Sequence, residues 1–268
     1  MLLARSSPLF KALTASVGCI IAFSVPASAQ TVPPLSAQTP NQSNESGFEF
    51  PSTVPGFEKL ENVHYLGSPS ILRGSDPGSQ VSILKQQGIT DVLIYRTETH
   101  GKAVDFEINE LRKAGYPSSS IFHIPVEWKT VQPFRDTCLQ TLEALRLLQV
   151  ASTTKGRRMY VHCTAGQDRT GVLSALFLML NGQGSKKDLF ASEMCAKGFA
   201  GASKTKPDHI AKSVREVLTP QYLKMASLIE SGKLTFTTID DSLCEQDPAS
   251  DAKFAANLKE DLKTYACD

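Results

Sequence analysis

The chain lacks a second long apolar run, an excess of charge of either sign and any internal repeat. Its one long apolar stretch, residues 12–25, lies near the amino terminus and is too short to span a membrane. Basic and acidic residues nearly balance, with 28 Lys and Arg against 27 Asp and Glu. Such a balance gives no indication of a nucleic-acid partner. We therefore expect no integral membrane span and no nucleic-acid binding.

Residues 1–29 have the pattern of a cleaved export signal. Arg5 and Lys11 precede or open the apolar run, and Ala27-Ser28-Ala29 ends the segment. This is the order of the basic, apolar and A-x-A regions of a signal peptide. We expect the protein to be exported, and to be either periplasmic or secreted. A lipid anchor at Cys19 is disfavoured, because this cysteine lies inside the apolar run.

Low apolar content also suggests the domain boundaries. Residues 30–53 are rich in Ser, Thr, Gln, Asn and Pro, so we expect a flexible leader. Residues 54–240 are numerous enough for one domain with a sizeable core. Residues 241–268 are polar and form a C-terminal tail that a disulfide would tether. The sequence leaves the oligomeric state open.

Cysteine is scarce, and its placement matters in an exported protein. The cysteines after the signal are Cys138, Cys163, Cys195, Cys244 and Cys267. In an oxidising compartment they allow two disulfides and one free thiol. Four cysteines pair in three ways, and we expect Cys244 with Cys267 first, because this pair would tie down the polar tail. Cys195 fits a structural bridge better than a redox pair with Cys163. The alternative is that every thiol stays reduced.

Apolar runs of strand length alternate with helical segments through the first two thirds of the chain. We expect strands at residues 63–66, 71–73, 91–96, 121–126 and 159–161, and helices at 79–87, 104–114, 134–150 and 172–180. This alternation predicts an α/β fold with a mostly parallel central sheet flanked by helices. The remaining chain predicts a helical C-terminal part, with helices at 186–196, 206–217, 220–231 and 254–265.

The most informative segment runs His162-Cys163-Thr164-Ala165-Gly166-Gln167-Asp168-Arg169-Thr170-Gly171 and joins the last strand to a strongly apolar helix. We call residues 163–169 the signature loop. A strand that enters a glycine-containing turn and opens a helix makes an anion cradle, because backbone N–H groups and the helix dipole favour the same negative charge. Here a cysteine opens the cradle and an arginine closes it.

The pattern His162-Cys163-(x)2-Gly166-(x)2-Arg169-Thr170-Gly171 resembles the signature of the protein tyrosine phosphatase superfamily. Residues 71–77 and 84–96 resemble the amino-terminal half of bacterial dual-specificity-like phosphatases. The resemblance implies a strand–P-loop–helix active site. It also implies a phosphomonoester hydrolase that forms a phospho-cysteine intermediate and acts on phosphotyrosine (dual-specificity) proteins or phosphoinositides. The alternatives are a phytase-like inositol phosphatase, a catalytically silent phospho-binding module and, less favoured, a sulfur-transfer enzyme.

Each position of the signature loop has a chemical reason. Cys163 would attack phosphorus as a thiolate, and Arg169 would bind two phosphoryl oxygens at once. Thr170 would hydrogen-bond the thiolate, and His162 would orient the loop. The phosphate-binding groups would come from Thr164, Ala165, Gly166, Gln167, Asp168 and Arg169. Because this cradle neutralises phosphate charge by itself, the sequence predicts no cofactor and no metal.

More than one residue is a candidate for the acid that protonates the leaving group. The resemblance implies an aspartate on the loop after the preceding strand, about 30 residues before the cysteine. Here that loop carries Glu127, and Asp136 follows at the start of the next helix. The short link at residues 151–158 favours Glu127, whereas Asp136 is also explained as a first-turn helix charge. Asp168, or no acid at all, is the third alternative.

Several side chains near the loop bear on the substrate. Asp168 beside Arg169 resembles the loops of bacterial tyrosine or inositide phosphatases, many of which carry lysine where this chain has Gln167. Without that charge, the cradle should suit multiply phosphorylated inositol less well. Trp128 either lines the pocket or anchors its own loop in the core. Other basic residues either border the mouth or form a solvated face: Lys129, Arg135, Lys186, Lys187, Lys204 and Lys206.

Overall fold

The computed structural model describes residues 49–98 and 101–267. The expected export signal and the expected leader as far as residue 48 lie outside this part of the chain. The described residues belong to one compact unit by their internal contacts. Within the described ranges, no helix is long and apolar enough to cross a membrane.

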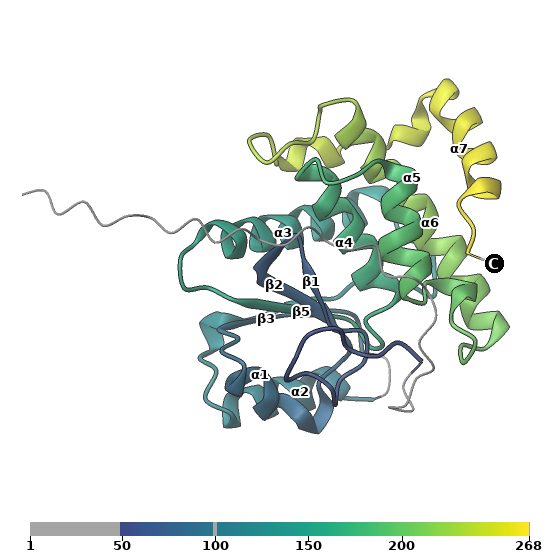
Figure 1. The fold of residues 1–268 in the computed structure, drawn as a ribbon. Helices are drawn as coiled ribbons and strands as arrows, with labels where there is room; N and C mark the ends of the chain where they lie inside the picture. Colours follow the sequence, from purple (N-terminus) through teal and green to yellow (C-terminus); the bar gives the residue numbers. More distant parts are fainter. Residues whose placement is uncertain (1–48, 99–100, 268) are drawn as a thin grey trace, which may run out of the picture. The chain divides into compact units, whose positions relative to one another are not determined.

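A five-stranded sheet forms the middle of this unit, in the order β1-β2-β5-β3-β4 (Figure 1). The strands are β1 (His64–Leu66), β2 (Ser68–Gly74), β3 (Asp91–Tyr95), β4 (Ile121–Ile124) and β5 (Met159–His162). The β1–β2 pair is antiparallel, and the other neighbouring pairs are parallel. The central strand β5 is buried along its whole length, as expected for a parallel strand covered on both faces. The predicted α/β class and mostly parallel sheet are confirmed.

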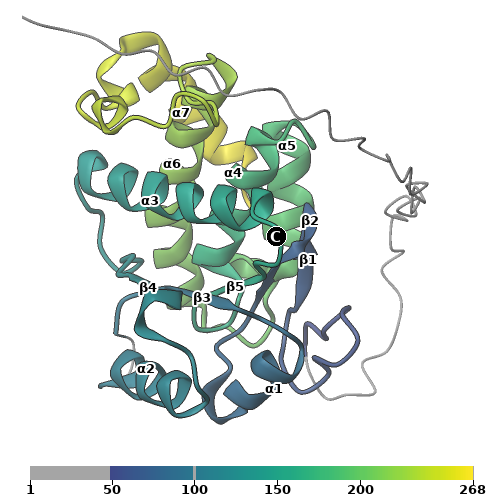
Figure 2. The same cartoon turned by 90° about the vertical axis from the view of Figure 1, so that its left-hand side faces the viewer.

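Helices cover the two faces of the sheet (Figures 1 and 2). The helices α1 (Val81–Gln86) and α2 (Ala103–Lys113) lie on one face, and α3 (Phe134–Thr153) and α4 (Asp168–Leu180) lie on the other. Successive side chains of β5 divide between these faces, since strand side chains alternate in direction. Met159 and Val161 join the core formed with α3 and α4, and Tyr160 joins the core formed with α1 and α2.

After α4 the described chain is helical, as expected. It contains α5 (Lys186–Leu189), a run of short helical turns, α6 (Asp208–Glu230) and α7 (Ala252–Thr264). The prediction of separate helices at 206–217 and 220–231 is wrong, because α6 is continuous through Pro220. A proline removes one helical hydrogen bond and crowds the preceding turn. Burial of Leu218 and Tyr222 beside it supplies the packing that offsets this cost.

Two disulfides join the C-terminal segment to earlier parts of the chain. Cys138 of α3 pairs with Cys244, and Cys195 pairs with Cys267, while Cys163 is free. The expectation of two bridges and one free thiol is confirmed. The expected Cys244–Cys267 pair is wrong. The bridges fasten the tail to two different elements, α3 and the helical turn at Cys195, which constrains the unfolded chain more than a short loop closed within the tail would.

The packed unit begins before residue 54. Asn62 donates its backbone N–H to Phe50 at 2.6 Å, and Thr53 donates to Val63 at 2.9 Å. The segment 49–53 is therefore hydrogen-bonded to the chain around β1. This places the end of the expected leader against the domain.

Candidate active site

The signature loop connects the central strand β5 to α4, which begins at Asp168 rather than at the predicted residue 172. Gly166 is the sharpest point of the loop, with a φ of +66°. A Cβ at this position would lie 2.4 Å from the backbone carbon and oxygen of Gly74. Only glycine fits this conformation and this close approach. The loop is therefore wedged against the end of β2.

Cys163 is buried at the start of the loop. Burial raises the pKa of its thiol, but the charge of Arg169 opposes burial and the net pKa is lowered. Thr170 lowers it further through its hydroxyl and its backbone N–H, whereas the charge of Asp168 raises it. A lowered thiol pKa increases the fraction of thiolate, which is the nucleophilic form.

Arg169 lies across the loop from the thiol, in the first turn of α4. Its guanidinium donates to the Thr164 hydroxyl at 3.1 Å and to the Val126 carbonyl at 3.3 Å. Its Nε is buried and has no hydrogen-bond partner in the described structure. A buried guanidinium donor without a partner is suited to an anionic ligand.

The carbonyl groups of the loop are held by the surrounding protein. His162 Nδ1 donates to the Cys163 carbonyl at 2.9 Å, and the backbone N–H of Asp76 donates to the Thr164 carbonyl at 2.9 Å. Arg73 donates to the Gly166 carbonyl at 2.6 Å. In a trans peptide the next N–H points opposite to the carbonyl. These contacts therefore turn the N–H groups of residues 164, 165 and 167 away from the protein groups that hold the loop.

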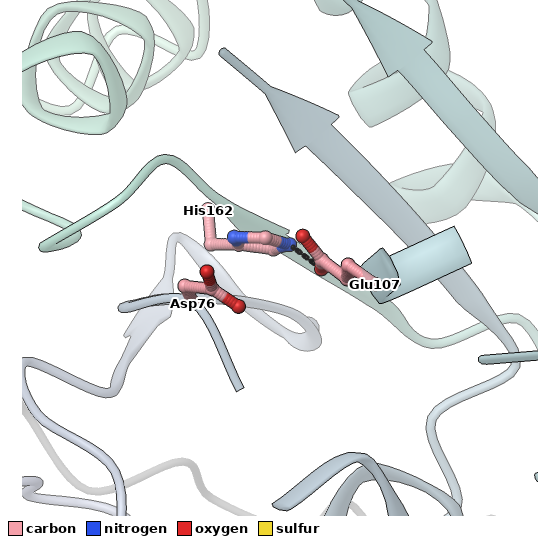
Figure 3. A group of neighbouring side chains, drawn as sticks. All are labelled: Asp76, Glu107 and His162. Atoms are coloured by element: carbon pink, nitrogen blue, oxygen red, sulfur yellow. Dashed lines mark ion pairs between the residues drawn. The ribbon is translucent and has the colours of Figure 1, made fainter. Parts of the chain in front are cut away.

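A buried charged group lies behind His162 (Figure 3). His162 Nε2 is 2.7 Å from Glu107 Oε1, and both side chains are buried. Burial opposes the imidazolium, but Glu107 outweighs it and raises the pKa of His162. Burial likewise opposes the carboxylate, but His162 and Arg96 lower the pKa of Glu107. Both shifts favour the charged form of the pair.

Arg96 extends this group toward the loop. It lies 2.9 Å from Glu107 Oε2 and 2.7 Å from Asp76 Oδ2. Asp76, Glu107 and His162 each offer one ligand atom, and these atoms lie within 4.8 Å of one another. This spacing would suit a metal ion, but Arg96 pairs with both carboxylates, and both ring nitrogens of His162 already face oxygen acceptors, Glu107 and the Cys163 carbonyl. We therefore interpret the cluster as an internal salt-bridge network and not as a metal centre.

The opposite side of the loop is held by Arg73 and Asn62. Arg73 is fully buried and also pairs with Glu193 at 3.0 Å. Asn62 donates to the carbonyls of Gly166 and Lys197, each at 3.0 Å. The loop is thus fixed to β2 and to the helical turns at 190–197.

Sequence reasoning missed the residues that hold the loop: Asn62, Arg73, Asp76, Arg96, Glu107 and Glu193. One signal could have found Glu107. It lies between Val104 and Leu111 on the buried side of α2, where a charged residue needs a partner. The other contacts join segments far apart in the chain and leave no local pattern.

The candidate acids have different surroundings. Glu127 is half-buried and follows Val126, whose carbonyl contacts Arg169. Its Oε1 accepts the backbone N–H groups of Trp128 at 2.7 Å and Lys129 at 2.6 Å. Its charge also raises the pKa of Arg169, against the larger lowering by burial. Asp136 is exposed in the first turn of α3. Glu127 is thus within electrostatic reach of Arg169 in the signature loop, whereas Asp136 lies on the exposed side of α3.

Trp128 is buried in the main core, in the same cluster as Phe134. It anchors the loop that carries Glu127. Of the two readings given by the sequence, core anchoring is the one that the burial supports.

The remaining loop side chains face residues 198–206. Asp168 Oδ1 accepts from Lys206 Nζ at 2.6 Å and from the Ala200 N–H at 2.9 Å. Gln167 is buried beside Gly198, where an added Cβ would lie 2.9 Å from its side-chain carbon. The six basic residues named from the sequence therefore separate, since only Lys206 is seen in contact with the loop. Others pair elsewhere, Lys186 with Glu230 and Asp261, and Arg135 with Glu245.

Comparisons with known proteins agree with this geometry. Residues 79–241 match the family described as "Tyrosine phosphatase family". No curated protein matches the sequence.

Solved structures with a similar chain path include several phosphatases. A putative phosphatase from Shewanella putrefaciens CN-32 is 21% identical, covers 60% of this chain and 95% of its own, and gives a TM-score of 0.41. TpbA from P. aeruginosa is 19% identical, covers 66% and 96%, and gives 0.43; it was also solved in complex with pTyr. The PP-IP phosphatase SIW14 from S. cerevisiae is 16% identical, covers 66% and 98%, and gives 0.40. At these identities and scores the likeness carries no conclusion about substrate.

Proposed function

Because the chain belongs to the tyrosine phosphatase family, we propose that it hydrolyses phosphotyrosine in proteins through a phospho-cysteine intermediate at Cys163. One observation carries this proposal. The free, buried thiol of Cys163 has its pKa lowered by Arg169, at the start of a loop in which the carbonyls of residues 163, 164 and 166 are held by surrounding protein groups. A thiolate facing backbone N–H groups and a guanidinium is the arrangement that phosphoryl transfer to cysteine needs.

In the first step, the Cys163 thiolate attacks phosphorus and the bond from phosphorus to the tyrosine oxygen breaks. Arg169 and the backbone N–H groups of the loop hold the three other phosphoryl oxygens and stabilise their charge. In the second step, water attacks phosphorus, inorganic phosphate leaves and the thiolate is restored. Thr170, which lowers the pKa of Cys163, stabilises the departing thiolate. The negative charge on the phosphoryl oxygens and on the departing thiolate is thus stabilised by groups of the chain in both steps.

Glu127 is the acid that we assign to the leaving group. Two backbone N–H groups hold its Oε1, which orients the carboxyl group and leaves Oε2 to carry the proton. It follows the residue whose carbonyl contacts Arg169. Asp136 is exposed on α3, and Asp168 is held by Lys206, so neither has a comparable position. After donating its proton, Glu127 would take one from the attacking water.

The side chains of the loop favour a singly phosphorylated substrate. Gln167 is neutral and buried beside Gly198, so it offers no charge to a second phosphate group. The ammonium group of Lys206 is paired with Asp168. Arg169 therefore supplies the main positive charge of the cradle. A phosphotyrosine residue fits this charge distribution better than a phosphoinositide with several phosphate groups.

We also propose that the protein is exported to the periplasm or beyond the cell. The sequence of residues 1–29 predicts a signal, and the two disulfides are typical of an oxidising compartment. Because the other four cysteines of the domain are paired in disulfides, Cys163 remains available as a thiol.

A panel of substrates tests the proposed function. The native protein would be assayed on a phosphotyrosine peptide, a phosphoserine peptide, and phosphoinositides with one and with two ring phosphates. We expect the highest kcat/KM on the phosphotyrosine peptide, no effect of a chelator, and no turnover by Cys163→Ser. A higher kcat/KM on the phosphoinositides would overturn the substrate assignment. Tight binding without turnover by the native protein would indicate a phospho-binding module instead.

A pair of variants tests the acid. Glu127→Gln should lower kcat on phosphotyrosine about 100-fold and remove the alkaline limb of the pH profile. A substrate with a more acidic leaving group should lose much less, because it needs less protonation. Asp136→Asn is the matched control and should stay within about twofold of the native rate. An unchanged pH profile for Glu127→Gln would exclude it as the acid.

A further inference from the structure

Lys206 makes a contact with the signature loop that phosphate binding does not explain. Its Nζ lies 2.6 Å from Asp168 Oδ1 and donates to the Gly198 carbonyl at 3.0 Å. The two residues are separated by 38 positions in the chain. The contact thus joins the start of α4 to the turn that precedes α6.

This ion pair is far less exposed than a typical surface pair. The side chains of Lys206 and Asp168 are 9% and 16% exposed. The Ala200 N–H donates to the same carboxylate oxygen at 2.9 Å. Two groups from residues 198–206, the Lys206 ammonium and the Ala200 N–H, therefore converge on Asp168 in the first turn of α4. A pair with so little water around it is screened less than exposed pairs, which contribute almost nothing.

The negative charge of Asp168 is unfavourable in a loop that binds anions. Its carboxylate precedes Arg169 directly, and its charge raises the pKa of Cys163. The other charged or titratable groups that act on the thiol are Arg169, Arg73 and Tyr160. Without a cation beside it, Asp168 would oppose both the thiolate and an incoming phosphate group.

We propose that Lys206 is a positioning residue of this site, which holds Asp168 against residues 198–200 and neutralises its charge beside the anion cradle. The catalytic part of this statement rests on the proposed phosphatase function. Lys206 does not touch the reacting atoms. It acts through Asp168, by fixing the first turn of α4 and by holding the Asp168 carboxylate against residues 198–200. This role also explains why Asp168 is tolerated next to the nucleophile.

Alkylation of Cys163 tests the proposal without relying on turnover. The rate of reaction with iodoacetamide would be followed against pH in the full chain, with Cys163→Ser giving the background rate. The variants are Lys206→Met, Lys206→Arg, Asp168→Asn and the double variant Lys206→Met/Asp168→Asn. Lys204→Met is the matched control, because Lys204 is exposed in the same turn. Thermal unfolding would show which variants remain folded.

We expect the alkylation midpoint of Lys206→Met to move to higher pH, and those of Lys206→Arg and Lys204→Met to stay in place. On a phosphotyrosine peptide, Lys206→Met should lose roughly three- to tenfold in kcat/KM at pH values below the midpoint. In the Asp168→Asn background, Lys206→Met should have little further effect on the midpoint. Asp168→Asn alone should move the midpoint to lower pH.

An unchanged midpoint in Lys206→Met would overturn the proposal. So would an equally large shift in the Asp168→Asn background, because Lys206 would then act independently of Asp168. If Lys206→Met does not fold, the alkylation midpoint of Asp168→Asn tests the proposal instead. An unchanged midpoint in that variant would overturn it. A midpoint shift in a protein that turns over no phosphotyrosine would support Lys206 and contradict the proposed function.

Discussion

The two ends of the signature loop are held in different ways. At the β5 end, His162 rests on a network contributed by the first half of the chain, in which the side chains of Arg96 and Glu107 are 2% and 1% exposed. At the α4 end, Asp168 is held by Lys206, and both are partly accessible. The Cys195–Cys267 bridge also lies on this second side, next to the turns at 195–202.

The comparison shows that the two ends of the loop are stabilised by different kinds of interaction. Buried ion pairs are costly to break because each partner left alone is an unpaired charge. The β5 end is therefore fixed by burial. The α4 end uses the Lys206–Asp168 pair, which is slightly more exposed, and the Cys195–Cys267 disulfide. We expect changes at the first end to reduce stability most, and changes at the second to alter the thiol.

Gly166→Ala should disturb the contacts at both ends of the signature loop and have the largest effect on activity. A Cβ here would collide with the backbone of Gly74, and the φ of +66° disfavours alanine. The loop would have to move, so we expect kcat/KM on p-nitrophenyl phosphate to fall at least about 100-fold. Gly156→Ala is the control, because its φ is +83° but nothing lies within 4 Å of the added carbon. Native activity in Gly166→Ala would contradict the tight packing of the loop.

Glu107→Ala should show the cost of breaking the network at the β5 end. It leaves His162 and Arg96 buried without their carboxylate, so the free energy of unfolding should fall by about 3–5 kcal/mol. Glu110→Ala, on the same helix, removes an exposed pair with Lys113 and should cost under about 1 kcal/mol. Denaturant unfolding measures both. Equal losses in the two variants would remove the distinction between a buried network and a surface pair.

Loss of the Cys195–Cys267 bridge should have a smaller effect on stability and a specific effect on the site. The double variant Cys195→Ser/Cys267→Ser should lower the free energy of unfolding by about 2–4 kcal/mol. Because residues 195–202 hold Asp168, it should also change the alkylation rate of Cys163. Removing Cys138–Cys244 in the same way should cost stability without changing that rate. Identical alkylation rates in both double variants would contradict the link between the bridge and the loop.

The pH dependence of stability gives the smallest effect. The raised pKa of His162 adds stability that is complete below 6.5 and is lost as pH rises through the folded value. The lowered pKa of Glu107 adds stability that is present above 4.5 and is lost as pH falls through the folded value. We therefore expect the contribution of the pair to be greatest between these two pH values and to decrease outside them. Glu107→Gln should flatten the curve of unfolding free energy against pH, and an unchanged curve would contradict the charged pair.

The sequence predicted those features of the fold that depend on residues close together in the chain. The alternating apolar runs predicted the sheet and its helices, and the segment 162–171 identified the signature loop because its chemistry lies in consecutive residues. Pro220 misled the prediction, since packing against the core outweighed the usual effect of proline. The disulfide pairing was also wrong, because spacing alone does not choose among the three pairings.

The side chains that hold the signature loop could not be predicted from the sequence. Arg73 and Gly166 are 93 positions apart, and Asp168 and Lys206 are 38 apart. Such contacts depend on the order of strands in the sheet and on the path of the C-terminal helices. Lys206 was one of six basic residues that fitted the mouth equally well until the fold separated them.

Trapping the covalent intermediate tests the central claim most directly. The native protein would be mixed with a phosphotyrosine peptide, quenched within milliseconds and digested, and its peptides would be analysed by mass spectrometry. We predict one added phosphoryl group on the peptide that contains Cys163 in the native protein, and none in Cys163→Ser. Unchanged turnover by Cys163→Ser, or a phosphoryl group on another residue, would contradict the assignment of Cys163 as the nucleophile.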